Sequence, residues 1–88
     1  MRHKIRGKIW EVVYKRKLPE DARGMCDSPD KKDKKITIKQ NLRGLVKLDT
    51  LLHEGIHAGL WDLDEEAVTE LAHDLARMVW KELGLYER

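Results

Sequence analysis

Two segments within residues 8–39 have the apolar patterns of β-strands. Residues 8–18 are rich in β-branched and aromatic side chains, and Pro19 ends the run. Residues 36–39 alternate apolar and polar side chains, as a half-buried strand requires. The intervening residues 20–35 have the Gly, Pro and Asp content of a connection, with room for a short strand near Met25. The pattern predicts a small sheet of two to three strands.

The second half of the chain has the periodicity of helices. A first set of apolar side chains recurs every three or four residues, at Leu45, Leu48, Leu52 and Ile56. Asn41 is a suitable N-cap for this helix, and Gly59 lies near the end of the pattern. We therefore predict a helix that follows Asn41 and buries one stripe of side chains.

A second helix is predicted after a short turn. Asp62 lies three residues before Glu65, an arrangement similar to a capping box, and Gly84 suits the C-cap of a helix that reaches about Leu83. The apolar face of this helix consists of Leu63, Ala67, Val68, Leu71, Leu75, Met78 and Val79. Together the elements predict a single α+β domain over residues 1–88, with two helices packed on a small sheet.

Composition narrows the class of protein. With 88 residues, of which 41% are hydrophobic and 39% charged, the chain suits one small folded domain with a modest core. Cys26 is the only cysteine, so no intramolecular disulfide can form and a cytoplasmic location is expected. No apolar run approaches the roughly 20 residues that span a bilayer, so no membrane partner is expected. The net charge of +2 gives only weak support for a nucleic-acid partner.

The first predicted helix carries the pattern H-E-x-x-H as His53-Glu54-Gly55-Ile56-His57. Residues four apart lie about 6 Å apart along a helix axis, so both imidazoles can bind one metal ion at roughly 2.0–2.1 Å. Glu54 then lies beside the open coordination position, where a carboxylate can take a proton from an attacking water. The motif predicts a Zn²⁺ site with Glu54 as the catalytic base, although such ligands also accept iron, manganese or cobalt.

A catalytic zinc ion needs a third protein ligand, and the second helix offers several carboxylates. Glu66 and Glu70 lie four residues apart and share a face with His73. We predict Glu66 as the third metal ligand and Glu70 as the acceptor of an imidazole N–H. Glu65 competes for the ligand role, but the capping pattern already accounts for it. His73 is either a catalytic residue that hydrogen-bonds the oxyanion or a partly exposed surface histidine.

Two segments of the chain resemble a known family. Leu51–Ala58 and Leu63–Val68 resemble the small gluzincin-type metallopeptidases related to the ImmA/IrrE family, many of them phage and prophage proteins. The match covers roughly residues 24–83. It implies a minimal zincin-like domain that uses zinc to hydrolyse a peptide or protein substrate.

The resemblance also bears on individual residues. Gluzincins have a glutamate ligand followed by alanine and an acidic residue four positions after the ligand, a pattern that Glu66-Ala67 and Glu70 match. By the same resemblance, an extended peptide substrate would lie along a sheet edge formed by Ile36, Thr37 and Ile38.

Two other functions stay open on the sequence alone. The chain departs from larger gluzincins because the downstream tyrosine or histidine that stabilises their transition state has no clear counterpart. A zinc-stabilised domain that binds a partner without catalysis is one alternative. A small nucleic-acid-binding protein that uses the basic segment Arg2–Lys17 is another. Glu54 discriminates the peptidase from a structural zinc site, because a structural site has no use for a base.

Overall fold

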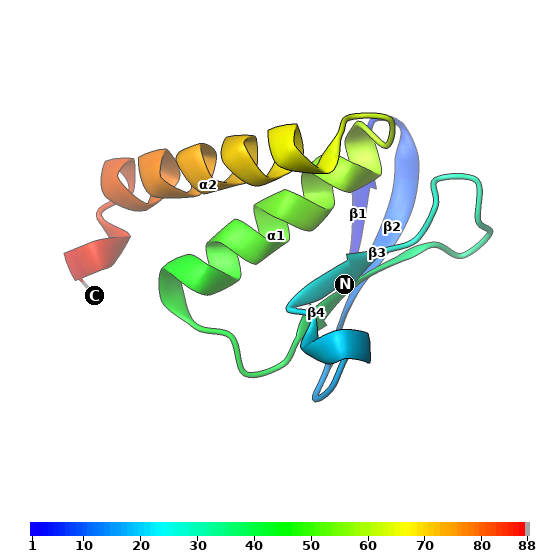
Figure 1. Cartoon of the computed structure of the whole chain (residues 1–88), viewed down its shortest axis with the longest axis horizontal. Coiled ribbons are helices and arrows are strands. Elements are labelled where there is room, and N and C mark those ends of the chain that lie inside the picture. The colour runs from blue at the N-terminus through cyan, green and yellow to red at the C-terminus, as the bar shows by residue number, and fades with distance from the viewer. Residues whose placement is uncertain (88) are drawn as a thin grey trace.

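The computed structural model describes residues 1–87 and is α+β, which confirms the predicted fold class (Figure 1). Four strands form one sheet: β1 (Arg2–Ile5), β2 (Lys8–Lys15), β3 (Gly24–Cys26) and β4 (Lys35–Lys39). Two α-helices follow, α1 (Gly44–Gly59) and α2 (Glu65–Glu82). Short 3-10 turns lie at Pro19–Asp21 and Leu85–Glu87. The H-E-x-x-H residues fall in the last two turns of α1.

The predicted count of two to three strands is wrong, because β1 adds a strand at the start of the chain. β1 pairs antiparallel with β2, and the turn between them consists of Arg6 and Gly7. Both turn residues have positive φ, 47° and 82°. Positive φ at both central residues is typical of the type I′ turn, whose twist matches that of paired strands. Residues 2–5 are mostly polar, so their composition alone does not indicate a strand.

Strand β4 lies inside the sheet, which has the order β1-β2-β4-β3. It pairs parallel with β2 on one side and antiparallel with β3 on the other. The expectation that Ile36, Thr37 and Ile38 form a free sheet edge is therefore wrong. The short strand β3 folds back against β4 and occupies that edge instead.

The core lies between the sheet and α1. Trp10 and Ile38 are fully buried, and Ile36 and Ala58 are nearly so. Side chains alternate between the two faces of a sheet, and the β2–β4 register places these three strand residues on the face that meets α1. Burial of a large apolar side chain contributes roughly 1.5–3 kcal/mol. Because this cluster is small, the stability of the folded domain also depends on other interactions.

Helix α1 lies between the sheet and α2 (Figure 1). Its N-cap is Arg43, which makes no side-chain cap bond, so the predicted cap at Asn41 is wrong. Its buried side chains are Thr50, Glu54 and Ala58, spaced one turn apart on the side that meets the sheet. The predicted buried stripe is only half-buried, at Leu45, Leu48, Leu52 and Ile56.

Helix α2 packs on α1 and not on the sheet, which corrects the prediction that both helices lie on the sheet. Its N-cap is Asp64 in place of the predicted Asp62, and Oδ1 of Asp64 accepts a hydrogen bond from the Ala67 N–H at 2.8 Å. The fully buried residues of α2 are Val68, Ala72 and Ala76. Across residues 1–87, neither helix is long and apolar enough to cross a membrane.

Candidate metal centre

Three side chains meet where the end of α1 passes the start of α2. His53 and His57 lie one helical turn apart, and their Nε2 atoms are separated by 3.2 Å. The two carboxylate oxygens of Glu65 lie 2.9 Å from Nε2 of His53 and 2.8 Å from Nε2 of His57. One ligand atom from each residue lies within 4.8 Å of the others. We refer to His53, His57 and Glu65 as the triad.

The donor atoms of the triad suit a zinc ion. Ligand atoms at 2.0–2.1 Å from a tetrahedral ion lie about 3.3 Å from one another, close to the 2.8–3.2 Å separations of this site. The lone pairs of two neutral imidazoles and a carboxylate repel when they point at one place, unless a cation or protons lie between them. Three protein ligands also leave one tetrahedral position for water or substrate.

Glu65, and not Glu66, reaches the two histidines. Successive helical residues are rotated by about 100°, and Glu65 lies three residues before the buried Val68, on the side of α2 that packs on α1. Glu66 and Glu70 are exposed, and the part of the chain that the structure describes has no hydrogen bond between either of them and a histidine. The predicted ligand role of Glu66 and orienting role of Glu70 do not agree with this geometry. Glu66, Glu70 and His73 share a face away from the apolar one, whereas a residue that reaches α1 has to lie on the packed face of α2.

Glu54 lies beside the triad and under strand β3. Its side chain is 7% exposed and lines the same hollow as the triad. A Cβ atom added at Gly24 would lie 2.8 Å from Oε2 of Glu54, so glycine allows β3 to pass this close to the carboxylate. Burial raises the pKa of the Glu54 carboxyl, His53 opposes this shift, and Glu65 adds to it. A partly desolvated carboxylate thus lies next to the triad.

Strand β3 has a free edge next to the triad. Backbone hydrogen bonds join Arg23 and Asp27 to β4. Because bonded and non-bonded pairs alternate along an antiparallel ladder, the backbone N–H and C=O groups of Gly24 and Cys26 point away from β4. Both residues line the hollow that holds the triad. An extended chain that pairs with β3 would therefore run past the triad.

His73 lines a second hollow together with His53 and Glu54. Its Nδ1 lies 2.9 Å from Nη1 of Arg77 and 3.3 Å from Oδ2 of Asp49. Arg77 can only donate and the Asp49 carboxylate can only accept, so the two contacts favour opposite tautomers of His73. Both contacts use Nδ1, and neither uses Nε2. The structure therefore places His73 beside the motif, and its catalytic role stays a prediction.

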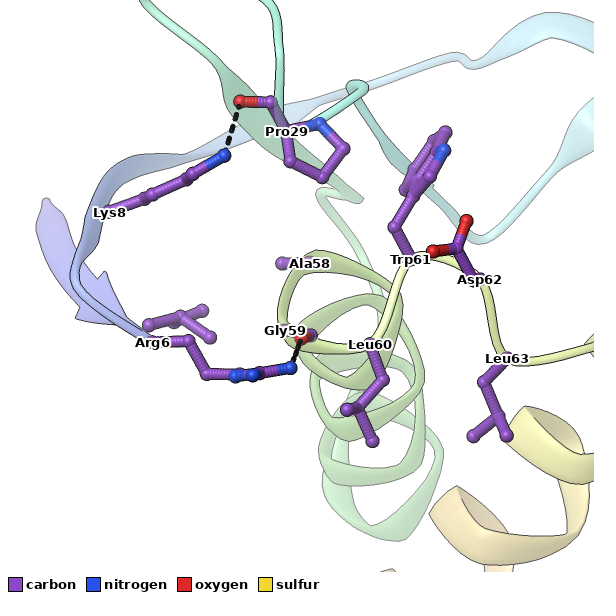
Figure 2. A pocket seen from close by; sticks show the side chains of 10 residues that line it. Arg6, Lys8, Pro29, Ala58, Gly59, Leu60, Trp61, Asp62 and Leu63 are labelled. Atoms are coloured by element: carbon purple, nitrogen blue, oxygen red, sulfur yellow. Dashed lines mark hydrogen bonds between the residues drawn. The ribbon is translucent and has the colours of Figure 1, made fainter.

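A wider hollow adjoins the site at the C-terminal end of α1 (Figure 2). It has a volume of about 500 Å³. Arg6 and Lys8 enter it from the β1–β2 hairpin, and each donates to a backbone carbonyl, at 3.0 Å and 3.3 Å. Trp61 borders this hollow and also the hollow of the triad, with its ring centre 6.5 Å from that of His57. An open hollow thus lies next to the triad.

Comparisons of the chain with protein-family models, with curated proteins and with solved structures found no match. The likeness to gluzincin-type metallopeptidases is therefore an interpretation of the motif. A function is therefore inferred from the arrangement of the triad and Glu54.

Gly24 and Trp61 were not predicted as parts of the site. The signal for Gly24 is weak, since a glycine in a strand pattern indicates a close backbone approach without naming the partner. Trp61 lies in the turn after α1, two residues beyond Gly59, so helical spacing does not place it beside His57.

Cys26 is expected to react slowly with alkylating reagents. Burial raises the pKa of its thiol to about 12, and the carboxylates of Glu54 and Asp27 add to the shift. The thiolate is the reactive form, and its pKa returns to about 8.5 in an unfolded chain. At pH 8, iodoacetamide should modify Cys26 at least about tenfold more slowly in the folded protein than in urea-unfolded protein. Mass spectrometry over time measures the two rates, and equal rates would contradict the burial of the thiol.

Proposed function

We propose that this chain is a zinc-dependent metallopeptidase of the gluzincin type. His53, His57 and Glu65 would hold the ion, and Glu54 would act as general base. The convergence of three ligand atoms beside a buried carboxylate carries the proposal. The H-E-x-x-H spacing on α1 supports it, because peptidases use that spacing to place a base next to two zinc ligands.

Each residue of the site has a separate task in this proposal. A zinc ion, when bound, supplies a Lewis acid that lowers the pKa of water and polarises a carbonyl. Glu54 would accept the proton of the water that attacks the scissile carbonyl and then pass it to the departing amine. Helix α1 carries this carboxylate, and the close passage of Gly24 limits its movement. His73 would donate a ring N–H to the oxygen that gains negative charge.

The substrate that fits this site is an extended segment of a peptide or protein. The outward-facing backbone groups of Gly24 and Cys26 offer hydrogen bonds to such a segment. The hollow next to Trp61 offers space for one of its side chains. The proposed substrate edge is therefore β3 and not the strand expected from the sequence.

A zinc-stabilised domain without catalytic activity is the second candidate. Structural zinc sites mostly have four protein ligands, whereas catalytic sites have three and keep one position open. The triad supplies three ligands and lines a hollow of about 360 Å³. A structural site also has no use for the carboxylate of Glu54. These features favour the peptidase.

Replacing the proposed base tests this function. Glu54→Gln should retain one bound zinc ion and the fold but lower the hydrolysis of a quenched fluorescent peptide library at least about a hundredfold, because the proton acceptor is lost. Zinc is measured by plasma mass spectrometry in the same samples. The control Glu70→Gln changes an exposed carboxylate on α2 and should retain wild-type activity.

Two results would count against the proposal. Full activity in Glu54→Gln would exclude this residue as the base. A wild-type protein that binds one zinc ion but hydrolyses no member of the library would favour the zinc-stabilised domain without catalysis.

A further inference from the structure

The two layers of the molecule carry opposite charge. Residues 1–43, which form the sheet and its connections, contain fourteen Lys and Arg and six Asp and Glu. Residues 44–88, which contain both helices, have four Lys and Arg and ten Asp and Glu. The net charge of +2 therefore hides a division into about +8 and −6. An anionic partner would be attracted to the sheet and repelled by the helices.

One face of the sheet meets α1, and neither α-helix packs on the other face, which we call the open face (Figure 1). The 3-10 turn Pro19–Asp21 borders this face at Lys39, and the loop residues Asp33 and Lys34 border it beside Glu11. Cations lie on this open face in two rows. Arg2 of β1 and Lys35 of β4 lie opposite Glu11 of β2 in the strand register and form the first row. Lys15 of β2 and Lys39 of β4 lie opposite each other in the strand register and form the second row. Four residues of β2 separate the rows, which corresponds to about 13 Å, and Glu11 is the one acidic residue in the strands.

A basic hollow extends the second row beyond the end of β2. Lys39 also donates to Asp21 at 2.9 Å, so Lys15 provides most of the free charge in its row. The hollow has a volume of about 490 Å³ and is lined by Arg16, Lys17, Gln40, Asn41 and Arg43. Three cations and two amides line it without an acidic side chain. This composition suits a phosphate group.

We propose that the open face of the sheet and the basic hollow bind the phosphate backbones of double-stranded DNA. The rows of cations are separated by about 13 Å, and the two backbones that flank the major groove of B-DNA are about 12 Å apart. Val13 and Thr37 lie between the rows and are small enough to face the groove. The triad lies on the helical side of the sheet, so this binding does not depend on the proposed peptidase activity.

The side chains of the open face favour a duplex over a single strand. Single strands are held mainly by aromatic rings on which their bases stack. The aromatic residues of β2 alternate to the opposite face, where Trp10 is buried in the core and the Tyr14 ring lies 5.0 Å from Nζ of Lys47 in α1. The open face therefore offers cations without a stacking surface, which matches contacts to the backbone of a duplex.

Fluorescence anisotropy with a labelled duplex of about 20 base pairs tests the proposal. The binding constant K is measured at a series of salt concentrations from about 50 mM upward. Lys15→Gln/Lys35→Gln removes one cation from each row, and Arg16→Gln/Arg43→Gln removes two from the hollow. Each pair should lower the slope of log K against log salt by about 2, since each phosphate contact contributes about 0.9. At about 100 mM salt each pair should weaken binding by about tenfold or more.

The matched control is Lys32→Gln/Lys81→Gln, which removes two exposed lysines from a loop and from α2 and should leave the slope unchanged. All six changed side chains lie at the surface, and circular dichroism checks that the variants fold. Three results would overturn the proposal: no binding at about 50 mM salt, an equal loss of slope in the control, or tighter binding of single-stranded DNA or polyglutamate than of the duplex.

Discussion

Glu65→Gln should weaken zinc binding at least about a hundredfold, whereas Glu66→Gln should leave it unchanged. Removal of residues that only support a metal ligand already costs about 10–100-fold, so the loss of a ligand charge costs at least the upper end of that range. Both oxygens of Glu65 lie within 3 Å of an imidazole nitrogen of the triad. Glu66 is exposed on the next position around the helix. The two variants remove the same charge from adjacent residues, so each controls for the other.

A chromophoric zinc chelator in competition with the protein measures the two affinities, and His53→Ala/His57→Ala supplies the zinc-free baseline. A loss of affinity in Glu66→Gln with none in Glu65→Gln would mean that α2 turns by one residue when zinc binds. Equal and small effects in both variants would mean that neither carboxylate is a ligand.

Zinc should raise the melting temperature of the wild-type protein by about 10–20 °C. A ligand at about 100 times its Kd stabilises the folded state by about 2.7 kcal/mol, and about 1 kcal/mol shifts the melting temperature of a domain this small by about 4–8 °C. The effect is large because the triad joins α1 to α2, and α2 packs on no part of the sheet. A bound metal ion would therefore hold the outer helix in place.

Circular dichroism melts with excess zinc and with EDTA measure this shift, and the shift should grow with the concentration of free zinc. The His53→Ala/His57→Ala variant should melt at one temperature in both solutions. A wild-type protein whose melting temperature does not change with zinc would contradict a metal site at the triad.

The helices were predictable from the sequence, and the arrangement of the strands was not. Helical periodicity is local, so residues 45–56 indicate α1 without information from elsewhere in the chain. Strand order depends on pairing between distant segments. Alternation at residues 36–39 indicates a strand but does not reveal that β3 pairs outside it. The sequence does not indicate the hairpin strand β1, because this strand is short and most of its residues are polar.

In the candidate site, too, the residues that depend on local spacing were predictable and those that depend on tertiary packing were not. His53, Glu54 and His57 follow from spacing within one helix. The choice between Glu65 and Glu66 depends on which side of α2 meets α1, and one residue rotates a side chain by about 100°. The cap at Asp64 in place of Asp62 accounts for part of the difference, because Glu65 then has no capping role and its carboxylate is free to reach the histidines. Gly24 comes from a strand that only the tertiary fold brings over Glu54.

All three residues of the triad lie within residues 53–65, and every strand precedes them in the chain. A metal ion that joins them closes a short loop, which costs little chain entropy, and the helical hairpin forms through local contacts that are made early in folding. The parallel pairing of β2 with β4 joins more distant segments and is expected to form later. We therefore expect the supply of zinc to affect the rate at which a newly made chain folds, before the carboxylate of Glu54 is covered by β3.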